Sequence, residues 1–517
     1  MRYPPIFKNT EGRNIKINIM KKIIFIILFF IFSVSCLYPI PKEIEDALKL
    51  NRINHFDEAL EVIENALNEE KIKPDITSAY TVGRILYRKG EFYREMAKLN
   101  VLTNLGYLIH VKDREKNPSD EIKLFLGIGY FLNKQFLEAA GILNQVVTNN
   151  SLNSELNGLA LVYLGAAYYR TGEKDKASDL WEKVKKDDPL AYSTQGYLNA
   201  YLGINPAKGE EMTKGVLARP GIDRLPYIDT LKVNYAYTLL SLGRFNEAYG
   251  QISNINLDTP IFIYKKDKNK EIRFYDLAIL QNYSKILFGE SIKNLEPIVT
   301  ASSGELASFA SYYVAQMYLY LENYDKSLKF ASKAKKLSVS SSLTRVRAVA
   351  CEASAGILMG KEKKGLKLLE KEISRIHGKP SSLLEMMMVV ISSGVDYTML
   401  KDTMNKIESF IYRTEWERTR RDTALLGEIS FFSRRYVSAL YYLERARDKG
   451  NKNKIETNDP NFLLKLSYVY YSREHYPESL EIFFSLGKRF SGIRPLQDAV
   501  QSVYSYKQKG SGEALID

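Results

Sequence analysis

Apolar residues recur at helical spacing along most of this chain, and one local pattern returns at intervals. An aromatic residue is followed three positions later by a small residue, in the pairs Phe56/Ala59, Phe136/Ala139, Phe245/Ala248, Tyr324/Ser327, Tyr436/Ala439 and Tyr476/Ser479. Twelve positions before the small residue of each pair stands a second small residue, and we call this position the small slot. With two incomplete pairs included, its occupants are Ala47, Gly83, Gly127, Gly165, Ala236, Ala315, Gly427 and Ser467. Chance places Gly, Ala or Ser at a position roughly one time in five. Eight small residues in eight slots therefore indicate a repeating helical unit.

Large residues fill a further slot, three positions after the small one. Seven of its eight occupants are large, namely Leu50, Leu86, Tyr130, Tyr168, Leu239, Tyr318 and Tyr470, and Ser430 is the exception. The pattern resembles the tetratricopeptide repeat, a 34-residue unit of two antiparallel helices with small residues where the helices cross. A small residue at a crossing lets two helix axes approach closely, and a large one from a neighbouring turn fills the adjacent hole.

The repeat predicts an all-α fold, a superhelical solenoid of antiparallel helix pairs. Recognisable units begin near residues 40, 76, 120, 158, 229, 308, 420 and 460. The three wide intervals leave room for one, one and two degenerate units, so we expect about twelve units in all. A weak unit is visible around Ala353 and Gly360, and residues 383–411 have helical apolar spacing. Such arrays contact mainly their neighbours, so we expect an open superhelix.

Interruptions of the pattern divide the chain into segments. We expect an unused upstream start over residues 1–19, a signal peptide over 20–35 and an N-terminal repeat array over 36–262. An irregular linking unit over 263–307, a C-terminal repeat array over 308–507 and a disordered tail over 508–517 follow. Charged or glycine-rich stretches such as Lys265–Glu271 are expected to be longer loops.

The N-terminus carries a targeting pattern that begins at Met20. Lys21 and Lys22 precede ten unbroken apolar residues from Ile23 to Phe32. That run is shorter than the ~20 residues that span a bilayer but suits a secretory signal. The residues Ser33, Val34 and Ser35 before Cys36 resemble a bacterial lipobox, of the relaxed kind known in spirochaete lipoproteins. The resemblance implies cleavage and acylation of Cys36; an ordinary cleaved signal or an uncleaved anchor is the alternative.

Composition limits the classes of function. The 517 residues carry a net charge of +13, of which residues 1–35 contribute +5. The remaining excess of about +8 is weak evidence for nucleic-acid binding and favours attraction to anionic lipid headgroups. Two cysteines cannot form a disulfide framework, and four histidines in separate units leave no plausible metal site.

Sequence motifs for catalysis are absent. The chain contains no GxxxxGK[ST], HExxH, GxSxG or CxxC, and Cys351 lies in an apolar helical run that suits a small buried residue. Lytic transglycosylases of the bacterial envelope also carry helical superhelices, but they need an appended lysozyme-like domain for which this chain has no room. We therefore expect no enzyme, no catalytic residues and no cofactor.

The concave groove is the remaining candidate site. In tetratricopeptide repeats, side chains of the first helix that face the concave surface contact peptides, and the resemblance places one set of residues there. These are Tyr169, Arg170, Tyr237, Tyr312, Gln316, Tyr320, Lys465, Tyr468 and Tyr471. Tyr and Arg combine apolar area with hydrogen-bonding tips, which suits recognition. The alternative is that these residues only pack against the next unit.

The resemblance implies a non-enzymatic protein–protein interaction scaffold of the bacterial cell envelope, exported and anchored in a membrane by its lipidated N-terminus or periplasmic after cleavage. Its partner would be a protein or peptide segment held in the groove, with no nucleic acid and no metal. The alternative is a periplasmic lipoprotein that binds a small hydrophobic ligand and associates with a transporter. Clustered Tyr and Phe side chains could line such a pocket.

Overall fold

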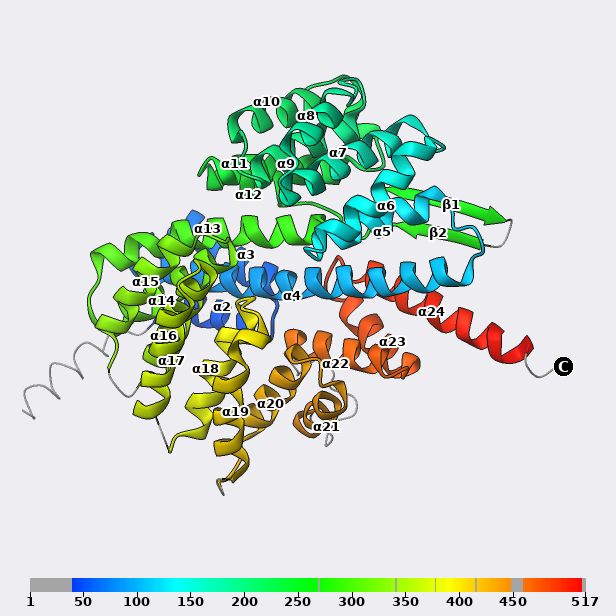
Figure 1. Cartoon of the computed structure of the whole chain (residues 1–517). Coiled ribbons are helices and arrows are strands. Elements are labelled where there is room, and N and C mark those ends of the chain that lie inside the picture. Colours follow the sequence, from blue (N-terminus) through cyan, green and yellow to red (C-terminus); the bar gives the residue numbers. More distant parts are fainter. Residues whose placement is uncertain are drawn as a thin grey trace, which may run out of the picture.

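The computed structural model describes residues 40–267, 270–339, 342–376, 378–413, 416–447 and 459–513. The segments expected at 1–19 and 20–35, and Cys36, lie outside these residues. Within them the chain is an all-α solenoid of helix pairs with one small β-hairpin (Figure 1). The predicted fold class is confirmed.

Ten consecutive helix pairs can be followed through the described residues. They are α2 (Lys42–Arg52) with α3 (Phe56–Asn68), α5 (Asp120–Leu132) with α6 (Phe136–Asn149), α7 (Ser154–Thr171) with α8 (Lys174–Glu182), α9 (Pro189–Tyr201) with α10 (Pro206–Leu217), α11 (Ile228–Ser241) with α12 (Phe245–Ile252), α14 (Gly304–Tyr320) with α15 (Tyr324–Leu337), α16 (Leu343–Leu358) with α17 (Glu362–Arg375), α18 (Pro380–Ser392) with α19 (Tyr397–Arg413), α20 (Arg420–Phe432) with α21 (Tyr436–Ala446), and α22 (Pro460–Ser472) with α23 (Tyr476–Gly487). A short 3₁₀ turn, η1 (Ile222–Arg224), precedes α11.

The small slot lies at the helix crossing, as the pattern predicts. A Cβ built on Gly127 would lie 2.5 Å from Cγ of Leu143, and one on Gly165 would lie 2.5 Å from Nε1 of Trp181. In the last pair the hydroxyl of Ser467 donates to the carbonyl of Ser479 at 2.7 Å. The first and second helices of these units are therefore in contact at the point where no larger side chain fits.

A left-handed residue marks the turn inside every one of the ten pairs. Half of these residues are glycines, with φ between 70° and 95°, and half are not, with φ between 57° and 66°. In chain order they are Asn54, Lys134, Gly172, Gly203, Gly243, Glu322, Gly360, Gly394, Arg434 and Glu474. In the eight units found from the sequence this slot lies seven positions after the small slot, so the turn geometry is a second register mark of the repeat.

The unit predicted near residue 76 is not a helix pair. Its turn slot is Gly90, but the chain stays helical there, and α4 runs unbroken from Ile76 to Arg114. A Cβ on Gly90 would lie 2.8 Å from Cε1 of Phe288, and one on Gly83 would lie 2.6 Å from Cγ of Leu295. The small residues of α4 therefore mark a crossing with α13 (Ile279–Ala301), which lies far away in the sequence.

The pairing of α4 with α13 makes the four units from α5 to α12 an insertion. Contacts that join lower numbers on α4 to higher numbers on α13 show that the two helices are antiparallel, and Ser291 donates to the carbonyl of Gly83 at 2.7 Å. Helices α5–α12, the N-terminal array, leave the solenoid after α4 and return at α13. Helices α14–α23, the C-terminal array, continue from α13 (Figure 1). The expectation of about twelve units is therefore met by ten local pairs and one pair closed across the insertion.

A β-hairpin replaces the degenerate unit expected between residues 229 and 308. Strand β1 (Phe262–Asp267) pairs with β2 (Lys270–Phe274) in antiparallel register, with Phe262 opposite Phe274. Phe274 stacks on Phe125 of α5 with ring centroids 4.2 Å apart, which docks the hairpin on the N-terminal array. The stretch 263–307, expected to be an irregular linking unit, holds this hairpin and helix α13.

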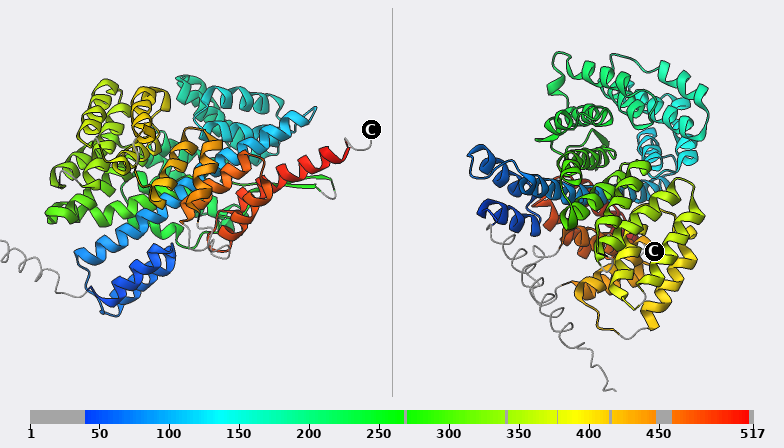
Figure 2. Two further views of the ribbon diagram at one scale, coloured as in Figure 1. Left: turned by 90° about the horizontal axis from the view of Figure 1, so that it is seen from below. Right: turned by 90° about the vertical axis from the view of Figure 1, so that its left-hand side faces the viewer.

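The two ends of the solenoid meet, so the expected open superhelix is wrong. Phe490, before α24 (Arg494–Glu513), lies 4.4 Å from Phe92 of α4 and 6.3 Å from Phe56 of α3 between ring centroids. Asp258, after α12, accepts from the backbone N–H groups of Gly492 and Arg494, both at 2.9 Å. Figure 2 shows α24 lying beside α4 with both arrays packed around that long helix.

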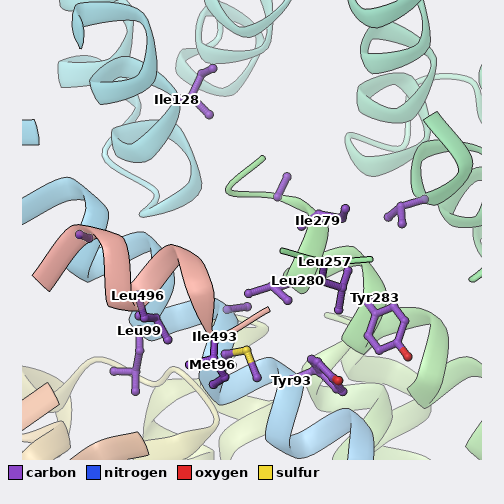
Figure 3. Packing of buried hydrophobic residues seen from close by; sticks show 14 of the residues in the cluster. Tyr93, Met96, Leu99, Ile128, Leu257, Ile279, Leu280, Tyr283, Ile493 and Leu496 are labelled. Atoms are coloured by element: carbon purple, nitrogen blue, oxygen red, sulfur yellow. The ribbon is translucent and has the colours of Figure 1, made fainter. Parts of the chain in front are cut away.

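The core between these parts gathers apolar residues from distant segments. Figure 3 shows Met96 of α4, Leu280 of α13 and Ile493 converging, with Leu257 from the loop after α12 beside them. All four are buried. Helix α24 extends to Glu513, so the tail expected to be disordered from residue 508 is helical as far as that residue.

Candidate ligand-binding cavity

A cavity of about 790 Å³ lies between α4 and the concave face of the C-terminal array. The first helices of successive pairs, α14, α16, α18, α20 and α22, supply one wall, and α4 supplies another. Its lining residues are Arg84, Tyr87, Arg88, Glu91, Glu95, Tyr312, Tyr313, Gln316, Tyr320, Arg347, Glu385, Met388, Val389, Ser392, Arg420, Arg421, Ala424, Leu425, Glu428, Ala446, Asp459, Asn461, Phe462 and Lys465.

A much smaller cavity lies on the concave side of the N-terminal array. It measures only about 20 Å³ and is lined in part by the segment from Tyr275 to Ala278, which follows the β-hairpin. A volume of that size holds about one water molecule. The chain itself therefore fills the concave side of the N-terminal array.

One face of α4 forms a wall of the large cavity. Arg84, the adjacent Tyr87 and Arg88, Glu91 and Glu95 recur every three or four residues, which places them on one side of a helix. The neighbouring side of α4, which carries Gly83 and Gly90, packs on α13, as described above. One face of α4 therefore lines the cavity, and another packs in the protein core.

A carboxylate shared by two arginines lies on the opposite wall. Glu385 of α18 accepts from Arg347 of α16 at 2.9 Å through Oε2 and from Arg421 of α20 at 2.5 Å through Oε1. Glu385 is 5% exposed, whereas the side chain of Arg421 is 65% exposed, so only the pair with Arg347 is largely shielded from solvent. One carboxylate facing two guanidinium groups leaves one positive charge in excess.

Tyrosines and one glutamine connect α4 to α14. The hydroxyl of Tyr87 lies 2.8 Å from Oε1 of Gln316 and 2.9 Å from Oε1 of Glu91, and Nε2 of Gln316 lies 2.6 Å from the hydroxyl of Tyr320. A tyrosine hydroxyl has one proton, so it cannot donate to both acceptors. Exchanging the amide O and N of Gln316 resolves this conflict, because each hydroxyl then donates one hydrogen bond. The Tyr320 hydroxyl donates to the Gln316 oxygen, the Gln316 nitrogen donates to the Tyr87 hydroxyl, and the Tyr87 hydroxyl donates to Glu91. The chain of hydrogen bonds then ends on the Glu91 carboxylate.

Carboxylates and cations alternate at the other end of the α4 wall. Glu95 pairs with Arg94 at 2.7 Å and with Lys98 at 3.4 Å. Burial would raise the pKa of Glu95, but Lys98 and Arg94 outweigh it and lower this pKa to about 2. Burial and the neighbouring Arg94 lower the pKa of Lys98 to about 8. Lys465 of α22 donates to Glu428 of α20 at 2.7 Å.

Glu91 differs from these carboxylates because it forms no ion pair with any described residue. Its hydrogen-bond partner is the hydroxyl of Tyr87. Burial raises the pKa of Glu91, and the nearby carboxylates Glu95 and Asp459 raise it further, against the lowering effect of Tyr87 and Lys465. The Glu91 carboxylate therefore lines a charged cavity without an ion-pair partner among the described residues.

Four of the nine predicted groove residues meet at this cavity. Tyr312, Gln316, Tyr320 and Lys465 all line it. Three of these side chains are buried or are already in contact with another side chain of the protein. Tyr312 is 5% exposed, the guanidinium carbon of Arg94 lies 3.7 Å from the ring centroid of Tyr320, and Lys465 is 3% exposed in its ion pair.

Three other predicted residues lie in the N-terminal array. The ring of Tyr169 lies 6.1 Å from Trp181 of the same unit. Arg170 lies 5.5 Å from the ring centroid of Tyr201, and the ammonium of Lys285 lies 5.6 Å from that of Tyr237. These residues make contacts within the chain and lie apart from the large cavity.

The last two predicted residues pack between helices. Tyr468 is 9% exposed and meets Phe431 edge to face at 5.8 Å. The ring of Tyr471 lies 6.1 Å from that of Tyr476, and a Cβ on Gly106 would lie 3.0 Å from its hydroxyl. Both tyrosines therefore contribute to packing between helices of the chain.

The cavity residues of α4, α16, α18 and α20 were missed. Arg84, Glu91 and Glu95 belong to a segment interpreted as a complete unit, so α4 was not expected to cross a groove. Arg347 and Glu385 lie in degenerate units whose register the aromatic pair did not mark. The left-handed turn residues Gly360 and Gly394 are the signal that would have aligned these units.

Other sites were searched for in the described residues. Groups of three or more His, Cys, Asp or Glu side chains placed to hold a metal ion were not found there. Cys351 is free and buried. Of the helices described, none has the length and apolar character needed to cross a membrane.

Helix pairs with small crossing residues, a left-handed turn and a concave face of first helices define a tetratricopeptide-like helical-repeat protein. No family model and no curated protein matches the chain. Solved structures that are similar include yeast Tom70, with 14% identity over 90% of this chain and 95% of that chain and a TM-score of 0.31. Another is the APC/C hetero-tetramer Cut9–Hcn1, with 12% identity over 89% and 92% and a TM-score of 0.24. Likenesses at these TM-scores support no argument about this chain.

Proposed function

We propose that this protein is a non-enzymatic scaffold that holds a segment of a partner protein in the cavity between α4 and the C-terminal array. The observation that carries the proposal is the lining itself. Tyr and Arg side chains, which are enriched among the residues that contribute most to binding at protein interfaces, gather there from α4, α14, α16 and α20 around about 790 Å³. That volume lies within the range of specific ligand sites.

The lining does not favour the alternative of a small hydrophobic ligand. Eleven of the 24 lining residues are charged. Burying an apolar ligand against them would remove charged groups from water without new partners, which costs free energy. A polypeptide with polar groups of its own can replace the lost hydration.

The proposal includes export and anchoring in a bacterial envelope through Cys36. It rests on the signal-like segment from Met20 to Ser35 and on the lipobox-like residues before Cys36. Feeding cells an alkyne fatty acid should label the wild-type chain and the Cys351→Ser control but not Cys36→Ser. Equal labelling of all three, or of none, would rule out acylation at Cys36.

Binding in the cavity is tested by photo-crosslinking in cells. A photoreactive amino acid at Tyr313, which is half-buried in the lining, should capture a defined partner protein. The same probe at Tyr441, which is 54% exposed on α21, is the matched control. Capture of the same proteins from both positions, or of no protein at Tyr313, would contradict a partner in the cavity.

A further inference from the structure

The cavity carries unpaired charge of opposite sign at two points along α4. Arg84 forms no hydrogen bond or ion pair with any described residue, and Glu91 forms no ion pair. Both side chains are half-buried, and both line the cavity. All other charged side chains of the lining have a partner within the chain.

Tyrosine rings link the Arg84 turn of α4 to Arg347 on the opposite wall. The ring of Tyr87, one helical turn from Arg84, lies 4.7 Å from that of Tyr313, and the guanidinium of Arg347 lies 6.0 Å from the ring of the adjacent Tyr312. Arg347 and Arg421 share the single carboxylate of Glu385, as described above. This end of the cavity, defined by Arg84, Arg347 and Arg421, therefore has more guanidinium groups than carboxylates and suits a carboxylate of the ligand.

The cations around Glu91 already have carboxylate partners. Glu95, Lys465 and Asp459 are its electrostatic neighbours, and Lys465 pairs with Glu428. The cations Lys98 and Arg94 pair with Glu95. A ligand cation at Glu91 would gain an ion pair and relieve repulsion between carboxylates. The ring of Tyr87, 4.7 Å from that of Tyr313, adds a face of the kind that attracts cations.

The spacing of the two charges fits an extended chain. Seven residues of α-helix separate Arg84 from Glu91, which is a rise of about 10.5 Å. An extended polypeptide advances about 3.3–3.6 Å per residue, so the same distance corresponds to about three residues.

We propose that the cavity selects a polypeptide segment in which an acidic residue and a basic residue lie about three positions apart, with Arg84 binding the acidic side chain and Glu91 the basic one. The inference rests on the proposed function and specifies its partner. Helix α4, which is not part of the C-terminal array, then determines which peptide sequence binds.

Selection from a displayed random 12-residue peptide library tests the inference on the purified full chain. The wild type should enrich peptides with an acidic and a basic residue about three positions apart. Glu91→Gln should lose the preference for the basic residue only, and Arg84→Gln the preference for the acidic residue only. Glu305→Gln and Arg473→Gln, which alter exposed side chains outside the cavity, should keep the wild-type pattern.

Affinity of an enriched peptide gives the second readout. Fluorescence anisotropy should show at least about tenfold weaker binding to Glu91→Gln and Arg84→Gln, the effect of losing a hydrogen bond to a charged group. Neither residue has an ion-pair partner that the change would leave uncompensated, and thermal melts matching the wild type will establish that the variants fold.

Failure of this inference differs from failure of the proposed function. Enriched peptides that lack the charge pattern, or a pattern unchanged in both variants, would overturn the inference while leaving a peptide-binding scaffold in place. No enriched peptide at all would overturn both.

Discussion

Gly83 and Leu295 lie in contact although they belong to helices on opposite sides of a four-unit insertion. A Cβ built on Gly83 would come within 2.6 Å of Cγ and 2.7 Å of Cδ2 of Leu295. The hydroxyl of Ser291 binds the carbonyl of Gly83 one turn away, at 2.7 Å. This contact closes the solenoid across residues 115–278.

Gly83→Ala should therefore destabilise the protein. The methyl group would force α4 from α13, a cost of about 1–3 kcal/mol that exceeds the gain in helix propensity. Gly141→Ala on α6 is the control, because no atom lies within 4 Å of its added Cβ and the variant should be as stable as wild type or more so. Chemical denaturation compares the two, and equal midpoints would contradict the α4–α13 contact.

Gly165→Leu tests the repeat register inside one unit. The space for its side chain is occupied by the indole of Trp181, whose Nε1 donates to the carbonyl of Val162 at 3.1 Å. Overpacking there should cost about 1–3 kcal/mol. A melting temperature unchanged from wild type would show that the crossing of α7 and α8 lies elsewhere.

Phe490→Ala should loosen the junction between the first and last parts of the solenoid. The ring is 8% exposed and packs on Phe92 and Phe56, so its loss should cost about 3–5 kcal/mol. Hydrogen exchange should rise in α2 and α3. Phe484→Ala removes a ring that is 48% exposed and should change stability by less than about 1 kcal/mol. Similar losses in the two variants would argue against a closed solenoid.

Asp188→Asn should raise stability at neutral pH but not at pH 4. Burial raises the pKa of Asp188 from 3.8 to about 6 against its backbone hydrogen bond from Ala191, with Glu155 and Asp187 adding to the shift. The folded state thus favours the protonated carboxyl. The stability contributed by Asp188 is complete below pH 3.8 and is lost as the pH rises through about 6.

The Asn side chain stays neutral and keeps the N-cap of α9. At pH 7.5 the variant should gain up to about 2 kcal/mol over wild type. Asp396→Asn should behave in the opposite sense, because a hydrogen bond from the backbone of Thr398 lowers the pKa of Asp396 and its contribution is lost as the pH falls. Denaturation at pH 4.5 and pH 7.5 separates the signs. A pH-independent difference for Asp188→Asn would contradict the burial of its charge.

Cys351 should resist thiol reagents in the native protein. It is fully buried in α16, and this burial raises its pKa to about 12, so the reactive thiolate is scarce at pH 8. Ellman's reagent should modify Cys351 only after denaturant opens the C-terminal array, as read by peptide mass spectrometry. Rapid labelling in buffer would show that α16 is accessible.

Sequence patterning predicted the helix pairs that keep the small slot and the aromatic pair. It could not predict the course of α4, because Gly83, Gly90 and Phe92 repeat the pattern of a unit while the turn itself is helical. Whether a glycine at the turn slot adopts positive φ depends on what packs there. At Gly90 the partner is Phe288, which no local pattern reveals.

Only four of the 24 lining residues of the cavity are among the groove residues expected from the sequence, for the same reason. Tyr312 and Gln316 were found because α14 keeps the repeat register, whereas Arg347 and Glu385 lie where the aromatic pair has been lost. Half of the turn residues are not glycines, among them Glu322 and Arg434, so positive φ could not be inferred from their identity. The part of the lining that comes from α4 follows from long-range pairing alone.

The insertion between α4 and α13 also fixes an order of events during synthesis. Helix α4 leaves the ribosome complete, but residues 115–278 must follow before α13 appears. At about 5–20 residues per second this takes roughly 10–30 s. The N-terminal array, made of local contacts, can fold within that time, while the apolar face of α4 stays uncovered. The cavity therefore comes into being last, once α13 and the C-terminal array have closed on a helix that was made near the beginning.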